Sequence, residues 1–298
     1  MVVSMCLWGL SWPSSKVMTH FCSPINLTAY RYILVVASLA IALPFFKGGY
    51  RIHKSGALFV IVSGVLLAVY SYFTFKGLSS GTAGAGGVLV TVLNPVFAYF
   101  IGIVLSKRPP SRNESIGLLL GLVAGATLLH IWDNLNAILA SGNLYFLLAA
   151  ITWAVMSKFT SKAGRYGTSV AFSFWQYVVC LVCVGTTMDY SELGRTLSTG
   201  TGLLWFNLFF NSVIVTAIAT TVFFYTTTRL GAERASSFLF LVPFAAALSA
   251  LIFLGEHIEA HTIMGGLTGI VAVYFINRKS FPDKRKGMME EVLPGSEQ

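Results

Sequence analysis

Charged residues are scarce in this sequence. Asp, Glu, Lys and Arg make up 10% of the 298 residues, whereas apolar residue types make up 55%. Soluble domains carry about 25% charged residues, and a soluble fold of this length could not bury so much apolar surface. The scarcity of charge therefore excludes an ordinary soluble domain, and we expect lipid to be the solvent for most of the chain.

Residue types that carry chemistry are also few. The sequence has four Cys and five His, and Cys180 and Cys183 have no second pair at zinc-site spacing. It contains no G-x-x-x-x-G-K-[ST] phosphate loop. These absences predict no metal, no cofactor and no enzymatic activity. A membrane-embedded enzyme is the alternative, and it would require His, Asp or Glu clustered at a membrane face.

Acidic residues are missing from the middle of every long apolar run. All eleven Asp and Glu lie in loops, near the ends of runs or in the C-terminal tail. A proton relay of buried carboxylates, or a dedicated site for polyvalent cations, would need acids inside the membrane. The distribution therefore argues against both.

Apolar runs, in contrast, are abundant. Ten of them approach the roughly 20 residues that a spanning helix needs, which predicts an all-α integral membrane protein with ten transmembrane helices. The predicted spans are 2–20, 24–46, 55–75, 84–106, 114–132, 142–160, 168–188, 202–225, 235–254 and 262–277.

The basic residues test this topology. With the N-terminus inside, 16 Lys and Arg fall on the cytoplasmic side, three fall outside, and Arg31 lies within the second span. The bias agrees with the positive-inside rule. We therefore expect both termini to be cytoplasmic, and we read the net charge of +9 as a topology signal rather than a sign of nucleic-acid binding. The three outer cations are Lys16, Lys76 and Arg195.

The two halves of the chain repeat one another. Five helices per half is an odd number, so the second half must cross the membrane in the opposite direction, as in many carriers. We predict inverted five-helix repeats over residues 1–140 and 141–280, followed by a disordered cytoplasmic tail over 281–298. The matching pairs are Trp8 with Trp153, Tyr30 with Trp175, Pro95 with Pro243, Gly117 with Gly265, and Gly121 with Gly269.

These residues resemble a known family. The first half has Leu7-Trp8-Gly9, then Lys16, Pro24 and Arg31, and the second has Pro243, Leu254-Gly255-Glu256, Gly265 and Gly269. Over residues 1–278 the pattern resembles the drug/metabolite transporter superfamily, EamA type. The resemblance implies ten helices, two EamA repeats and export or exchange of small metabolites such as amino acids. One position departs from the family pattern, because Arg108 stands in the first half where Glu256 stands in the second.

Polar and aromatic residues inside the runs are candidates for the substrate pathway. Aromatic side chains can line a cavity, but Trp and Tyr also form interfacial belts. Asparagines can bind a substrate, but they can equally join helices. The candidates are Trp8, Trp12, Tyr72, Asn94, Trp153, Asn207, Asn211 and Tyr225.

Four further residues are candidates for hinges or gates. Pro95 and Pro243 lie inside spans, where proline removes a backbone hydrogen bond and bends a helix. Arg31 is an intramembrane charge that needs compensation; we favour a structural or gating role over binding of a substrate carboxylate. Glu256 is a candidate for gating or for capping a helix.

The sequence therefore favours a secondary active transporter that works by alternating access in the cytoplasmic membrane, as a monomer or homodimer. Its partners are the lipid bilayer and a small-molecule substrate, and we expect export of amino acids or related compounds. An uptake carrier or an exchanger, for example of nucleotide-linked metabolites, is the main alternative. A channel is a further one, although channels usually take their pore from oligomer symmetry or a filter loop.

Overall fold

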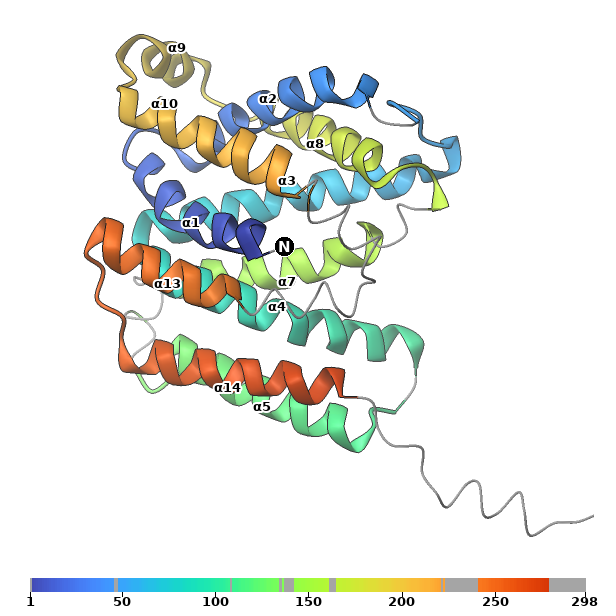
Figure 1. The fold of residues 1–298 in the computed structure, drawn as a ribbon, viewed down its shortest axis with the longest axis vertical. Coiled ribbons are helices and arrows are strands. Elements are labelled where there is room, and N and C mark those ends of the chain that lie inside the picture. The colour runs from blue at the N-terminus through green and yellow to red at the C-terminus, as the bar shows by residue number, and fades with distance from the viewer. Residues whose placement is uncertain are drawn as a thin grey trace, which may run out of the picture.

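The computed structural model describes residues 2–45, 48–107, 109–133, 136, 142–160, 165–220, 222 and 241–278. Within these ranges the protein is built of helices, and its β-structure is limited to one isolated bridge between Ile52 and Gly167 (Figure 1). The all-α class predicted from the sequence is confirmed. The predicted tail (281–298) and the first residues of the ninth predicted span lie outside the described residues.

Each of the ten predicted apolar segments coincides with helical structure where it is described. Among the described residues, four segments are long and apolar enough to cross a membrane: Pro24–Phe45, Lys54–Ser80, Ala83–Val104 and Gly202–Ala219. The helices are α1 (Val2–Met18), α2 (Pro24–Ala42), α3 (Ala57–Ser80), α4 (Ala83–Ser106), α5 (Arg112–Leu129), α7 (Asn143–Thr160), α8 (Ser169–Gly185), α9 (Tyr190–Thr199), α10 (Gly202–Phe209), the π-helix η4 (Phe210–Ala219), α13 (Leu241–Leu254) and α14 (Ala260–Asn277), with short 3₁₀ turns η1 (Leu43–Phe45) and η2 (Lys54–Gly56).

Short polar side chains fix where several helices begin. Ser23, Thr82 and Thr168 accept hydrogen bonds from backbone N–H groups in the first turns of α2, α4 and α8. Ser111 and Glu114 form a capping box at the start of α5. These caps satisfy N–H groups that would otherwise lack a partner at a helix start.

Eight helical segments form a closed ring. In order of contact they are α1, α13, α4, α7, α3, α8, α2 and η4, and η4 contacts α1 again. Helices α5 and α14 pack against each other outside this ring, beside α4. In Figure 1 these outer helices lie on the same side of the molecule as α4 and α13, whereas α2, α3, α8 and α10 lie on the other.

Glycines bring helix backbones together at the contact between α5 and α14. A Cβ atom on Gly117 would lie 2.7 Å from the carbonyl oxygen of Ala272, and one on Gly265 would lie 2.6 Å from Cγ of Leu128. These approaches leave no room for a side chain. They confirm that the two glycines, which are repeat partners in the sequence, are packing residues.

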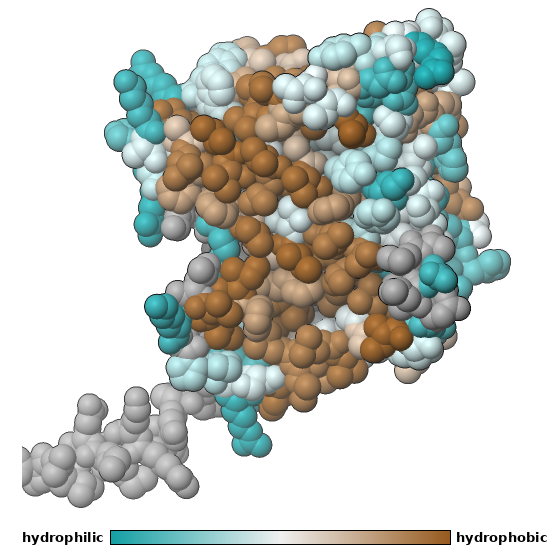
Figure 2. All heavy atoms as spheres, turned by 180° about the vertical axis from the view of Figure 1, so that it is seen from behind, coloured by the Kyte–Doolittle hydropathy of each residue, from teal (hydrophilic) through white to brown (hydrophobic). Residues whose placement is uncertain are grey.

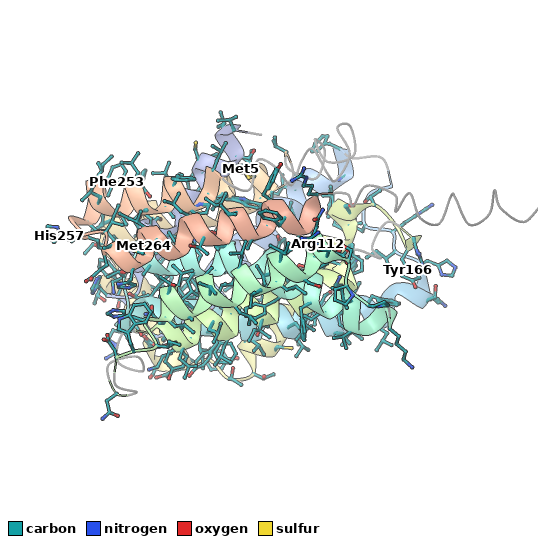
Figure 3. All side chains as sticks on the ribbon, turned by 90° about the horizontal axis from the view of Figure 1, so that it is seen from below. Met5, Arg112, Tyr166, Phe253, His257 and Met264 are labelled. Atoms are coloured by element: carbon teal, nitrogen blue, oxygen red, sulfur yellow. The ribbon has the colours of Figure 1, made fainter. Side chains whose placement is uncertain are left out.

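The outer surface is apolar between two polar ends. Figure 2 shows brown residues across the middle of one face, and large exposed apolar side chains include Leu119, Phe206 and Phe253. Figure 3 places His257 at one end of the bundle and Arg112 and Tyr166 at the other. We call the first the α3–α4 end, because the turn between those helices lies beside His257, and the second the basic end.

Helix α9 was not predicted from the sequence. It is bent by 107° relative to α8 and lies against the start of α2. The Glu192 carboxylate accepts hydrogen bonds from the backbone N–H and the hydroxyl of Ser23, both at 2.6 Å, and from Nδ2 of Asn26 at 2.7 Å. The Tyr30 hydroxyl donates to the Leu193 carbonyl at 2.8 Å. A polar helix therefore fastens the α1–α2 connection.

The contacts of Glu192 with the α1–α2 connection lead to a prediction about thiol labelling. Cys22 lies buried in the α1–α2 connection, and burial, followed by the charge of Glu192, raises the pKa of its thiol to about 12. Its thiolate is therefore rare at neutral pH. We expect Glu192→Ala to speed maleimide labelling of Cys22 at pH 7.5 by about tenfold, measured by mass spectrometry, because it removes a cover and a negative charge together. Equal rates in wild type and variant would contradict the fastening role, and Glu259→Ala is the control.

Candidate functional site

A cationic side chain lies at mid-helix in the bundle. Arg31, on α2, donates a hydrogen bond from Nη2 to the Thr216 hydroxyl of η4 at 2.9 Å. Its guanidinium carbon lies 5.7 Å from the centre of the Tyr32 ring. Its Nε is buried and has no hydrogen-bond partner within the part of the chain that the structure describes. In the described part of the chain the carboxylates lie in loops or near helix ends, so none of them neutralises this charge mid-membrane.

The partner of Arg31 is positioned by a π-helix. Ten residues of η4 adopt this rare geometry, and the Thr216 hydroxyl donates to the carbonyl of Asn211, five residues earlier, at 2.8 Å. π-Helical turns are uncommon and occur often at functional sites. In the same segment Ser212 is fully buried, and its hydroxyl finds no hydrogen-bond partner among the described residues. Unsatisfied polar atoms are thus found on both α2 and η4.

Aromatic rings surround this cluster. Tyr70 of α3 packs on Trp153 of α7 with ring centres 4.7 Å apart, and Tyr32 stacks on Tyr177 of α8 at 5.4 Å. All four rings pack in one hydrophobic cluster, and Tyr32 is the neighbour of Arg31 on α2. Trp153, a predicted pathway residue, therefore lies in the same neighbourhood as Arg31, and five ring segments contribute to the site.

Three other predicted aromatic residues lie elsewhere. Trp12 is buried and packs edge-to-face on Phe146 of α7 at 6.0 Å, which is a core contact. Trp8 is partly buried on α1. Tyr72 is 38% exposed and packs on its neighbour Phe73. Their assignment to the substrate pathway stays a prediction.

The two asparagines on the eighth predicted span join helices. Asn211 is fully buried; its Nδ2 donates to the Ser14 hydroxyl at 2.8 Å, and its Oδ1 accepts from the Ser15 hydroxyl at 3.3 Å. The Asn207 backbone carbonyl accepts from the Ser14 hydroxyl at 3.4 Å, whereas its side-chain amide donates to a backbone carbonyl of its own helix at 2.8 Å. Of the two roles that the sequence left open, the side-chain contacts of Asn211 supply helix–helix attachment. Asn94, in contrast, is partly buried on α4.

The predicted prolines lie within helices. Helix α4 continues through Pro95, whose side chain is not described, and Pro243 is buried near the first described residue of α13. The sequence analysis missed Pro13, which is buried inside α1 and leaves the Gly9 carbonyl without its usual helical donor. Tyr225 lies outside the described residues.

Glu256, the remaining predicted residue, is a helix cap. Its two carboxylate oxygens accept hydrogen bonds from the backbone N–H groups of Ala83 and Gly84, each at 2.9 Å, at the start of α4. Beside it, Nζ of Lys16 donates to the carbonyls of Leu78 and Gly81, at 2.5 and 2.7 Å. An anion thus meets a helix N-terminus and a cation meets a helix C-terminus, as helix dipoles favour. We call Lys16 and Glu256 together the clamp.

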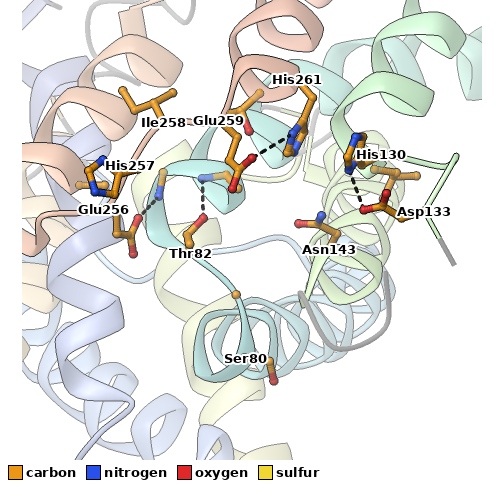
Figure 4. Close-up of a pocket in the computed structure, with 16 residues that line it drawn as sticks. Ser80, Thr82, His130, Asp133, Asn143, Glu256, His257, Ile258, Glu259 and His261 are labelled. Atoms are coloured by element: carbon orange, nitrogen blue, oxygen red, sulfur yellow. Dashed lines mark hydrogen bonds and ion pairs between the residues drawn. The ribbon is translucent and has the colours of Figure 1, made fainter. Parts of the chain in front are cut away.

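A pocket of about 350 Å³ lies beside the clamp (Figure 4). His130 and His261 line the pocket and stack on each other with ring centres 4.5 Å apart. Asp133 lies 2.7 Å from Nδ1 of His130, and Glu259 lies 3.7 Å from Nδ1 of His261. The histidines come from opposite halves of the chain, so the pocket lies where the two halves meet at the α3–α4 end. Nothing in the sequence indicated that these two histidines lie side by side.

Three further polar residues were not identified as site residues from the sequence: Lys16 of the clamp, and Thr216 and Ser212 of η4. Lys16 was counted as an outer cation, and neither Thr216 nor Ser212 was noted. Their relevant neighbours lie far along the chain: 62 residues separate Lys16 from Leu78, and 185 separate Arg31 from Thr216. Hydroxyls on apolar helices are common, so the one available signal was that Arg31 must find a polar partner.

Comparison with known proteins agrees with this architecture. The EamA-like transporter family matches residues 1–129 and 140–278. A chloroplastic WAT1-related protein of Arabidopsis thaliana is 25% identical over 93% of this chain and 67% of its own length. An uncharacterized transporter of Bacillus subtilis is 23% identical over 94% and 95%, and a probable terminal-alkyne amino-acid exporter of Streptantibioticus cattleyicolor is 23% identical over 96% and 95%.

A solved crystal structure has a similar fold. It superposes with a TM-score of 0.55 at 18% identity, covering 92% of this chain and 94% of the other. The resemblance drawn from the sequence motifs is confirmed. Since the family match covers most of the residues, including the whole ring of helices, the chain belongs to the EamA-like transporter family.

Proposed function

We propose that this protein is a secondary carrier that exports amino acids or related compact metabolites from the cytoplasm by alternating access. Members of the family are integral membrane proteins. In the proposed topology ten helices form two inverted halves, over residues 1–140 and 141–280, in the cytoplasmic membrane with both termini inside. The α3–α4 end then faces outward and the basic end faces the cytoplasm.

The order of helices in the ring carries this proposal. The repeat relates α1 to α7, α2 to α8, α3 to α10–η4 and α4 to α13. When each helix is replaced by its relative, the α1–α13 contact corresponds to the α7–α4 contact. In the same way the α3–α7 contact corresponds to the η4–α1 contact. The pairs α2–α8, α4–α13 and α5–α14 map onto themselves. Such interchangeability is what a carrier needs to open a shared site to alternate faces.

The clamp supports a gate at the outer end. Lys16 belongs to the first half and Glu256 to the second, and both hold the turn between α3 and α4. The bonds of Lys16 stay within the first half, and those of Glu256 join the second half to the first at that turn. A gate of this kind breaks and reforms a few charge-assisted hydrogen bonds, each of which contributes about 1.5–3 kcal/mol.

The substrate class rests on two observations. A relative similar over nearly the full chain is named as an exporter of an amino acid. The mid-membrane cluster offers one cation and several aromatic rings, which suits a small molecule with one acidic group.

Counterflow in proteoliposomes tests the proposal. Vesicles containing the purified protein and loaded with an unlabelled L-amino acid should accumulate the same labelled amino acid transiently and with saturation. A carrier exchanges substrate across the membrane, whereas a channel only dissipates the gradient. Empty vesicles are the control. Flux that does not saturate, or an absence of counterflow for all twenty amino acids, would contradict the proposed function.

A further inference from the structure

We propose that Arg31, with Thr216 and Ser212 of η4, binds the carboxylate group of the transported molecule. This inference rests on the proposed carrier function and names the chemical group that the site recognises. It assigns a binding role to a charge that the sequence analysis favoured as structural or gating.

The Arg31 charge is only partly compensated by its described neighbours. An intramembrane guanidinium costs several kcal/mol unless it is paired, and here it has one neutral hydrogen bond, to Thr216, and one aromatic neighbour, Tyr32. Nε is buried without a partner among the described residues. A guanidinium presents its N–H groups as a planar fork that fits the two oxygens of a carboxylate. The unused donor is therefore available to an oxygen of a bound carboxylate.

The buried hydroxyl of Ser212 is available to a ligand. A buried hydroxyl without a partner is costly, so each such case calls for an explanation. Ser212 precedes Thr216 by four residues in a helix with more than four residues per turn, so both residues lie on nearly the same face of η4. The donor that Ser212 offers is therefore one turn from the oxygen that Arg31 contacts. A ligand oxygen between them would satisfy both groups.

The site lies near the middle of its helices and is bordered by aromatic rings. Arg31, Tyr70, Trp153 and Tyr177 each lie near the middle of their helices, where carriers bind their substrates. The paired rings of Tyr70 and Trp153 provide an apolar face and a surface that attracts an ammonium group. An α-amino acid has both groups on adjacent atoms. The single cation favours monocarboxylates over dicarboxylates.

The test compares acids with their amides. In counterflow vesicles we would measure L-phenylalanine, L-leucine and L-threonine against L-phenylalaninamide, L-leucinamide and L-threoninamide, which keep size and ammonium but lose the carboxylate charge. Wild type should take up at least one acid about tenfold faster than its amide, as expected for loss of a charged hydrogen-bonded pair. Arg31→Gln should abolish this preference, whereas Arg31→Lys should keep part of it.

Two further variants separate binding from folding. Ser212→Ala removes a hydroxyl that makes no hydrogen bond to any described residue, so it should leave the melting temperature unchanged or higher while raising KM for the acid about threefold or more. Arg51→Gln removes a guanidinium from the exposed connection at the basic end and should change neither preference nor KM. If Arg31→Gln does not fold, Arg31→Lys and Ser212→Ala still report on the site.

The outcomes distinguish this inference from the proposed function. Saturable counterflow with equal rates for acids and amides, or with a KM indifferent to Arg31→Lys and Ser212→Ala, would overturn carboxylate binding and leave the carrier intact. No counterflow of any of the twenty amino acids by folded wild-type protein would overturn the amino-acid carrier itself, and the carboxylate site with it.

Discussion

Gly117→Ala should destabilise the protein by about 1–3 kcal/mol, whereas Gly125→Ala should stabilise it by up to about 1 kcal/mol. Both glycines lie in α5. A Cβ on Gly117 would lie 2.7 Å from the backbone oxygen of Ala272, which cannot move without shifting α14. A Cβ on Gly125 would meet Leu93 at an ordinary 3.5 Å, so that alanine keeps its higher helix propensity there without a clash.

The measurement is denaturation by SDS in mixed micelles, followed by tryptophan fluorescence. The two variants are matched, because each adds one methyl group to the same helix. A destabilisation of equal size at both positions would show that α14 does not approach α5 as closely as described. Gly194→Ala, at a glycine with open space around it, is a further reference.

Glu256→Ala should lower the free energy of unfolding by about 1–2 kcal/mol, since it removes the cap of α4. Its two oxygens are the acceptors for Ala83 and Gly84, and the charge also faces Lys16. Glu256→Gln should be intermediate, because the amide keeps one acceptor oxygen and loses the charge. The same SDS titration would measure both variants.

A neighbouring carboxylate supplies the control for this prediction. Glu259 has a side chain that is 71% exposed and approaches His261 at 3.7 Å. Glu259→Ala should therefore change stability by less than about 0.5 kcal/mol. If Glu256→Ala were as mild as Glu259→Ala, the clamp would not be a significant stabilising contact.

The sequence predicted the helices and the close packing of glycines well. Both depend on local properties: the length of an apolar run sets a membrane helix, and small residues four apart set a contact ridge. Glu256 was also singled out, and capping was one of its two expected roles. Helix α9, in contrast, was not predicted, because Tyr190–Thr199 contains few apolar residues and its composition is typical of a loop.

The contacts of the site could not be predicted from the sequence. The π-geometry of η4 has no proline or glycine to mark it, and residues 210–219 fit an ordinary α-helix equally well. Lys16 binds backbone carbonyls, which every residue possesses, so no side-chain pattern identifies its partners. Arg31 was recognisable as a charge that needs compensation, but Thr216 could be named only once the helices were placed together.

Helices α5 and α14 come from opposite halves of the sequence, yet small residues hold their backbones in contact outside the ring. Sliding one along the other would separate Gly117 and Gly265 from the surfaces that they contact. In a carrier that works as proposed, we therefore expect this pair to move as one unit while the eight inner segments tilt.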